Sequence, residues 1–391
     1  MNFLTYPATA EQKELIALAG ELADRFAKRA LDYDWEGRFP SENYDDLRKS
    51  GYLALTVPRD FGGQGASLLD VTMAQARLGQ GCASTALAVS MHLTNVARLT
   101  EELTVPEEVY AELCRAVVEE GAMLNFAASE PATGSPTRGG RPTTTAYRQA
   151  DGSWRITGRK TFTTGSLALQ FFRVSCNIQD QTSGLEPLTV DQGNFLVPRH
   201  AAGLRIDETW NSLSMRGSGS NDLVLEDVHV APNAFMGQSI LKDRKNGWGL
   251  ITTAIYLGIA QAARNEAIHF AHHRRPNSLD KPISSLPHIQ EKVARMDLAL
   301  LQSRALLFAV AEQASNDLDL ISGGQLGAAK YTVTNQAIEI VDIAMRLVGA
   351  AGLSLQMPLQ RYYRDVRAGL HTPPMDDSTF SMLAREALET S

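Results

Sequence analysis

The stretch of sequence that decides the fold reads Ser129-Glu130-Pro131-Ala132-Thr133-Gly134-Ser135. Proline, glycine and small hydroxyl residues of this kind form tight turns between strands. Around it, in residues 121–233, glycine, serine and threonine are dense, and short apolar runs such as 194–197 and 223–230 predict strands. This part of the chain is therefore predicted to be a small β-domain of the barrel or sandwich type.

On both sides of this region the sequence predicts helices. Residues 11–30 carry apolar side chains at three- and four-residue steps, which is typical of one buried helix face. A further helical stretch is predicted from residue 69 to about residue 98. After residue 234 the same spacing recurs in long, alanine-rich stretches that can pack closely as a four-helix bundle. The predicted fold class is α+β, with an N-terminal helical domain (1–120), a β-domain (121–233) and a C-terminal helical bundle domain (234–391).

Composition excludes several classes of protein. The chain has 391 residues, 44% of them hydrophobic, and a formal net charge of -7, which is ordinary for a globular protein. Lysine and arginine are scattered, so no nucleic-acid partner is expected. The three cysteines form no CxxC pair, and no metal site is expected. No stretch reaches the about 20 apolar residues of a membrane span, and residues 1–15 do not read as a signal peptide, so we expect a cytoplasmic protein.

Five further stretches follow the same order as motifs of one known family. They are Val57-Pro58-Arg59-Asp60-Phe61-Gly62-Gly63-Gln64-Gly65, Gly158-Arg159-Lys160-Thr161-Phe162-Thr163-Thr164, Met215-Arg216-Gly217-Ser218, Leu257-Gly258-Ile259-Ala260-Gln261 and Arg364-Asp365. With the Ser129–Ser135 stretch, they resemble the acyl-CoA dehydrogenase family over nearly the whole chain. The resemblance implies the three-domain fold of that family and an FAD-dependent oxidoreductase.

The resemblance implies a flavin ring at the β-domain. It assigns Phe126, Ala128 and Ser129 to the polar edge of the ring, Phe162 to its face and the Thr164 hydroxyl to its N5 atom. A flat ring with apolar faces needs such a wall and a few hydrogen-bond donors. If residues 162–164 continue a strand, a spacing of two places both side chains on one face. Without the resemblance, the same residues read as an ordinary turn and a packed strand.

The resemblance also implies residues for the other end of FAD. Arg274 matches an arginine that crosses to the neighbouring subunit and pairs with the pyrophosphate, a role that suits the forked guanidinium. Gly349 and Ala350 match a glycine-rich loop under the adenine, where Arg346 stands in place of the usual glutamine. Binding of FAD across subunits implies a homodimer or a homotetramer.

For the substrate, the resemblance implies an acyl-CoA or an acyl-carrier thioester and a role in fatty acid metabolism. It places Ser135 beside the thioester-linked chain and residues 87–96, which include His92, around the acyl group. An electron-transfer flavoprotein is a candidate acceptor of the electrons. A lone histidine on a helix is nevertheless more often a satisfied core residue than a functional one.

The catalytic base is the point at which the sequence departs from the family. Members abstract an α-proton with a glutamate after the Arg-Asp pair, and this position is Pro373; the alternative positions on the C-terminal helix are Trp248 and Gly249. We therefore consider Asp376, Asp377 and His371 as catalytic residues, with helix capping as the other interpretation of the two aspartates.

Three functions remain open from the sequence. The first is α,β-dehydrogenation of an acyl thioester, with hydride transfer to flavin N5. The second, indicated by His371 and Pro373, is a flavin-dependent monooxygenase of the same fold that uses a C4a-hydroperoxyflavin and takes FMN or FAD. The third is a non-catalytic homologue that binds acyl thioesters.

Overall fold

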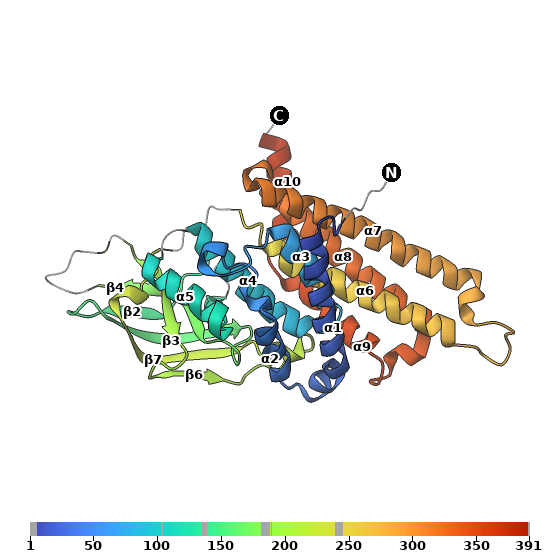
Figure 1. Cartoon of the computed structure of the whole chain (residues 1–391), viewed down its shortest axis with the longest axis horizontal. Helices are drawn as coiled ribbons and strands as arrows, with labels where there is room; N and C mark the ends of the chain where they lie inside the picture. The colour runs from blue at the N-terminus through green and yellow to red at the C-terminus, as the bar shows by residue number, and fades with distance from the viewer. Residues whose placement is uncertain are drawn as a thin grey trace.

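Helices occupy both ends of the chain and a sheet occupies its middle (Figure 1). The computed structural model describes residues 6–102, 105–134, 139–180, 188, 190–238 and 245–389. Strands begin four residues after the last N-terminal helix, and long helices resume after the last strand. In the described part of the chain, no helix has both the length and the hydropathy that a membrane crossing requires.

The N-terminal region consists of α1 (Ala10–Glu36), α2 (Ser41–Ser50), α3 (Leu68–Leu78), α4 (Ala83–Glu102) and α5 (Glu107–Glu120). The prediction of one helix over residues 69–98 was wrong, because the chain turns between α3 and α4. Gly81 lies in this turn, and a Cβ atom there would stand 2.1 Å from the main-chain oxygen of Ala23 in α1. The turn therefore follows from the close approach of α1, which the helical spacing does not reveal.

The middle region is one curled sheet built from β1 (Leu124–Ala127), β2 (Thr145–Arg148), β3 (Trp154–Thr163), β4 (Phe171–Gln179), β5 (Gln192–Pro198), β6 (Leu204–Asp207) and β7 (Asn221–Val230). The strand order is β1-β4-β2-β3-β7-β6, with β5 on β4. β4 pairs in parallel with both β1 and β2, one after the other along its length. The end of β1 is thereby held close to the end of β3, where two of the sequence motifs lie.

The C-terminal region contains the long helices α6 (Gly249–His273), α7 (Pro287–Asn316) and α8 (Gly323–Val348). They lie side by side in Figure 1, and α10 (Asp376–Glu389) packs on α8 as a fourth helix. α6 is buried on most of its surface because α3 and α4 cover the side that α7 and α8 leave open. The short α9 (Leu359–Asp365) leads into the last turn before α10.

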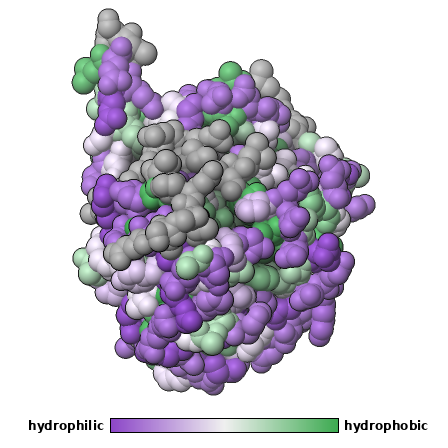
Figure 2. Space-filling model, turned by 90° about the vertical axis from the view of Figure 1, so that its left-hand side faces the viewer, coloured by the Kyte–Doolittle hydropathy of each residue, from purple (hydrophilic) through white to green (hydrophobic). Residues whose placement is uncertain are grey.

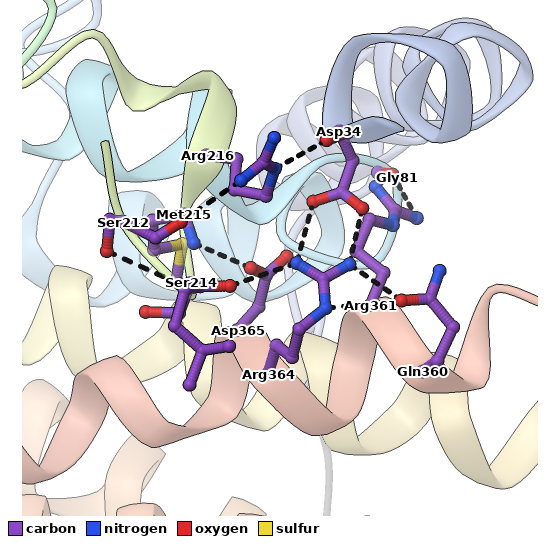
Figure 3. Close-up of polar contacts among 11 residues, drawn as sticks. Asp34, Gly81, Ser212, Ser214, Met215, Arg216, Gln360, Arg361, Arg364 and Asp365 are labelled. Atoms are coloured by element: carbon purple, nitrogen blue, oxygen red, sulfur yellow. Dashed lines mark hydrogen bonds and ion pairs between the residues drawn. The ribbon is translucent and has the colours of Figure 1, made fainter. Parts of the chain in front are cut away.

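One polar cluster joins all three regions of the chain (Figure 3). Arg364 of α9 forms an ion pair with Asp34 of α1 and donates to the Leu213 carbonyl of the β-domain at 3.0 Å. Its neighbour Asp365 accepts a hydrogen bond from the Met215 N–H at 2.7 Å. The Arg-Asp pair found in the sequence is thus a junction between domains.

The end of the molecule that the β-domain forms is shown in Figure 2. The coloured part of this face is mainly hydrophilic, and its apolar residues are scattered rather than gathered into a patch. The apolar side chains of the sheet point inward, where Trp154 and Phe195 make an edge contact at 4.9 Å between ring centroids. This end of the molecule therefore presents no apolar patch on the described surface that Figure 2 shows.

Candidate functional site

Two of the sequence motifs lie side by side at the junction of the β-domain and the helices. The Ser129 carbonyl accepts a hydrogen bond from the Thr161 N–H at 2.9 Å. Four residues before Ser129, the amide of Asn125 donates to the Thr164 carbonyl at 2.9 Å. The structure thus brings together the turn after β1 and the end of β3, as the resemblance implied.

A buried ion pair between the neighbours of Ser129 and Thr161 stabilises this arrangement. Lys160 Nζ lies 2.7 Å from Glu130 Oε1, and both side chains are buried. The Glu130 carboxylate also accepts hydrogen bonds from the Thr143 hydroxyl and from the N–H groups of Thr143 and Thr144. Burial alone would raise the pKa of Glu130, but these donors outweigh it and hold the pKa at about 2. Glu130 therefore stays ionised, and it fixes the positions of Ser129 and Thr161 on either side.

Phe162 has an unusual backbone and an exposed ring. Its φ is 54°, in the left-handed region, where a bulky residue costs about 1–3 kcal/mol. The side chain is 63% exposed, and its ring meets the Trp210 ring edge-on at 6.0 Å. The register between β3 and β7 shifts between Lys160 and Thr163. The regular strand alternation that was predicted for residues 162–164 is therefore interrupted here. The side chains of Phe162 and Thr164 are nevertheless both accessible, and Thr163 between them is buried.

A third motif reaches the same place through hydroxyl groups. The Thr164 Oγ1 lies 2.9 Å from the Ser220 Oγ, and the Ser220 Oγ lies 2.8 Å from the Ser218 Oγ. The Gly165 N–H also donates to the Ser218 carbonyl at 2.9 Å. The sequence predicted a motif over Met215–Ser218 but indicated no role for Ser218 or for Ser220, which follows it. Their hydroxyl content was the available signal, but only the fold shows that they meet Thr164.

The residues predicted for the far end of FAD form a separate group. Arg274 is the exposed residue that ends α6, and Arg346 and Gly349 lie at the end of α8. Gly349 has a φ of 70°, and a Cβ atom there would meet no atom within 4 Å. α6 is 25 residues long, which corresponds to about 37 Å, and it runs away from the β-domain in Figure 1. Within one chain, this group and the group around Phe162 lie at opposite ends of the bundle.

The acidic residues predicted as catalytic are engaged in structural contacts. Asp376 begins α10 and accepts hydrogen bonds from Lys330 Nζ at 3.5 Å and from Asn335 Nδ2 at 3.3 Å, both on α8. Asp377 is exposed, and its carboxylate accepts the N–H of Ser378 at 2.9 Å. The capping interpretation does not hold for Asp376, because α10 already begins at this residue and its carboxylate contacts α8 rather than an N–H group of α10. Asp377 lies inside the first turn of α10 and accepts only the N–H of the next residue.

His371 lies just before Pro373, at the end of the short helical turn Val366–His371. Its side chain is exposed, and among the described residues it makes no hydrogen bond or ion pair. Its neighbour Thr372 is anchored, because the Tyr256 hydroxyl lies 2.8 Å from the Thr372 hydroxyl. The turn therefore exposes the His371 imidazole beside a residue, Thr372, that a hydrogen bond to α6 holds in place.

His92 does not fit the prediction that it binds substrate. The ring is fully buried, its Nε2 lies 3.0 Å from the Leu53 carbonyl, and its Nδ1 accepts the Leu124 N–H at 3.2 Å. Burial lowers its pKa to about 4, so the imidazole is neutral and joins α4 to β1. The other residue predicted to bind substrate, Ser135, lies outside the described residues.

Comparison with family models identifies the class of protein. The acyl-CoA dehydrogenase N-terminal domain matches residues 9–114, the middle domain matches residues 125–228, and the C-terminal domain matches residues 248–370. The three matches follow the helical, β and helical regions of the structure. The chain therefore belongs to the acyl-CoA dehydrogenase family, with the three-domain fold of that family, and it is an enzyme of the oxidoreductase class.

Individual relatives span different chemistries. The chain is 45% identical over 386 residues to "Putative acyl-CoA dehydrogenase YdbM" of Bacillus subtilis, covering 97% of this chain and 98% of the relative. It is 30% identical to the amino sugar nitrososynthase DnmZ of Streptomyces peucetius, covering 94% and 91%. The solved structure of FMN-bound TdsC from Paenibacillus sp. A11-2 is similar to this chain with a TM-score of 0.85 at 25% identity. The match covers 97% of this chain and 98% of that chain.

The residues at the junction fit a flavin. An exposed aromatic ring in a strained backbone, with a hydroxyl two residues away, supplies the apolar wall and the donor that a flat heterocycle requires. The family uses FAD, and the TdsC neighbour holds FMN. At the other end of the bundle, the exposed guanidinium of Arg274 and the open backbone at Gly349 suit a phosphate and a flat base.

Proposed function

We propose that this protein is a flavin-dependent oxidoreductase that dehydrogenates an acyl thioester between its α and β carbons. The observation that carries the proposal is the convergence of three motifs on the surface around Phe162 and Thr164, in a chain that matches all three domains of the family. When bound, the flavin supplies the acceptor for the hydride. Phe162 would supply the apolar wall for its ring, and the Thr164 hydroxyl would supply a hydrogen bond to its polar edge.

The second group of cofactor residues supports an oligomer. Arg274 follows the end of α6 that points away from the β-domain in Figure 1, whereas Phe162 belongs to β3 of that domain, which supports FAD sites made by more than one chain. We propose that Arg274 and Gly349 serve the site of a second copy of the chain, with Arg274 donating to the pyrophosphate and Gly349 and Ala350 lying under the adenine. The protein is then a homodimer or a homotetramer.

The proton from the α carbon needs an acceptor that is not Pro373. Asp376 is occupied by Lys330 and Asn335, whereas the imidazole of His371 is free and exposed. We propose His371 as the group that takes this proton. An imidazole suits the role because one of its ring nitrogens can accept a proton.

The test is anaerobic mixing of the FAD-loaded protein with acyl-CoA thioesters of four to sixteen carbons, straight and branched. The expected result is bleaching of the flavin absorbance with at least one thioester, and loss of that bleaching in the variant His371→Ala with FAD still bound. A matched control is His273→Ala, on the exposed end of α6. Absence of bleaching with every thioester would overturn the dehydrogenase proposal.

A second reaction is favoured by one observation, namely that no described carboxylate of the 371–377 turn is free. A monooxygenase of the same fold needs no base for an α-proton, and His371 would then donate a hydrogen bond to bound oxygen. The test mixes the chemically reduced protein with oxygen. A transient absorbance distinct from those of oxidised and reduced flavin, together with no reduction by thioesters, would support this reaction over dehydrogenation.

A further inference from the structure

Three hydroxyl groups form a continuous chain from the protein interior to the surface proposed to hold the flavin. Ser218 and Ser220 are buried, and Thr164 is partly exposed. The successive oxygen–oxygen distances are 2.8 Å and 2.9 Å, which are ordinary for O–H···O hydrogen bonds. Each hydroxyl has one proton to donate, so the chain can point either outward or inward.

The buried Ser218 hydroxyl determines which hydroxyl donates to which along this chain of hydrogen bonds. Among the residues that the structure describes, the Ser218 hydroxyl has Ser220 as its only partner. If Ser220 donated to Ser218, the proton of Ser218 would be buried without an acceptor, which costs about 1–3 kcal/mol. If Ser218 donates to Ser220 and Ser220 donates to Thr164, both buried protons are satisfied. The outward direction is therefore favoured.

The outward direction leaves the proton of Thr164 without a good acceptor inside the protein. Among the residues that the structure describes, its one other acceptor is the Phe162 carbonyl at 3.5 Å, which is long for a hydroxyl hydrogen bond. The proton of Thr164 thus points toward the exposed surface beside the Phe162 ring. A ligand atom in this position meets a donor rather than an acceptor.

The turn that carries the serines is held rigidly from behind. Met215 has a φ of 52° in the left-handed region, and its N–H donates to Asp365 at 2.7 Å. Asp365 is 2% exposed, and the charge of Arg361 lies nearby. The Ser218 N–H donates to the Met215 carbonyl at 2.9 Å, so this anchor continues into the serine turn. The hydroxyl chain consequently has a fixed inner end.

We propose that Ser218 and Ser220 are positioning residues that orient the Thr164 hydroxyl as a hydrogen-bond donor to the ring nitrogen that accepts the hydride. This inference rests on the proposed flavin site. In the oxidised ring that nitrogen accepts a hydrogen bond, and in the reduced ring it carries a hydrogen. A donor fixed in this direction therefore favours binding of the oxidised ring over the reduced one.

The experiment compares the dissociation constants of oxidised FAD and dithionite-reduced FAD for the full-length protein under anaerobic conditions. Replacing Ser220 by alanine removes the group that directs the Thr164 proton, so the hydroxyl becomes free to accept from the reduced ring. The variant Ser220→Ala is expected to shift the ratio of the two constants about tenfold in favour of reduced FAD, a rise of about 30 mV in the two-electron potential. Ser218→Ala is expected to shift it in the same direction by a smaller factor.

Two controls separate orientation from a structural effect. Ser214→Ala makes the same chemical change in the same loop, outside the hydroxyl chain, and should leave the ratio unchanged. Thr164→Val removes the end of the chain, so adding Ser220→Ala to it should change nothing further. A merely structural role of Ser220 would weaken oxidised and reduced FAD equally and leave the ratio as it is.

Two results would overturn the inference, and they differ in what else they overturn. If the wild-type protein binds FAD but neither Ser220→Ala nor Ser218→Ala shifts the ratio, the hydroxyl chain has no orienting role, while the proposed flavin site stands. If the wild-type protein binds neither FAD nor FMN in either redox state, the proposed function fails together with the inference.

Discussion

The junction around Phe162 and the turn 371–377 behave differently as sites. At the junction, residues from three separate motifs meet through hydrogen bonds of the main chain and of hydroxyls. In the turn, Asp376 faces away into a contact with Lys330, which lies 46 residues earlier on α8. A sequence motif that specifies a main-chain conformation predicts where its residues lie. The position of an acidic residue in a loop does not predict which side chain it will contact.

The largest expected effect concerns the ion pair that supports the junction. Replacing Lys160 by methionine leaves the Glu130 carboxylate buried without its cation. We expect the free energy of unfolding to fall by about 3–5 kcal/mol, because an uncompensated buried charge is costly. Chemical denaturation of the variant and the wild type measures this difference.

A matched change at the same ion pair sharpens the test. The double variant Glu130→Gln, Lys160→Met removes both charges and should recover a large part of the lost stability. Ser175→Ala removes only a hydroxyl that accepts from Lys160 at 3.1 Å and should cost much less. If Lys160→Met unfolds at the same denaturant concentration as the wild type, the ion pair does not support the junction.

The next effect distinguishes a structural His92 from one that binds substrate. The pKa of His92 is about 4 in the folded protein and about 6.5 when unfolded. The folded state therefore binds fewer protons between these values, and the free energy of unfolding falls as the pH falls from 6.5 to 4. The contribution of His92 to this loss is about 3 kcal/mol.

The variant His92→Gln cannot titrate, and its amide can still contact the main-chain groups of Leu53 and Leu124. Its free energy of unfolding should vary less with pH between 6.5 and 4 than that of the wild type, as measured by urea denaturation at each pH. Equal slopes for the two proteins would show that His92 is not held neutral by burial.

A smaller effect tests the strained aromatic residue at the junction. Glycine adopts a positive φ without steric cost, so Phe162→Gly should raise the free energy of unfolding of the flavin-free protein by about 1 kcal/mol. The same variant loses the ring and should bind FAD at least about tenfold more weakly. Phe162→Trp keeps the aromatic wall and should bind FAD within about twofold of the wild type. A glycine variant with unchanged FAD affinity would separate Phe162 from the flavin.

The smallest effect concerns the two aspartates of the 371–377 turn. Asp376→Asn weakens the contact with Lys330 and should lower the free energy of unfolding by about 1 kcal/mol, whereas Asp377→Asn should change it by less than about 0.5 kcal/mol. Both variants should keep the rate of flavin reduction within about threefold of the wild type, as followed by stopped-flow absorbance. A folded Asp376→Asn variant that no longer reduces its flavin would restore Asp376 as the catalytic base.

Sequence patterns alone predicted the order of the three regions, although they missed the turn between α3 and α4. Helical spacing and the clustering of glycine, proline and threonine are local properties, so they predicted helices, sheet and helices without knowledge of the partners. That Ser129 and Thr164 belong to one site was implied by the family resemblance, because the residues alone read as an ordinary turn and a packed strand.

The tertiary structure alone decided the contacts between distant residues. It turned the backbone of Phe162, joined Thr164 to Ser220 and directed Asp376 toward Lys330. It also separated Arg274 from the junction by the length of α6. The physical reason is that each of these features depends on a neighbour far away in the chain, and local sequence patterns carry no information about which neighbour the fold supplies.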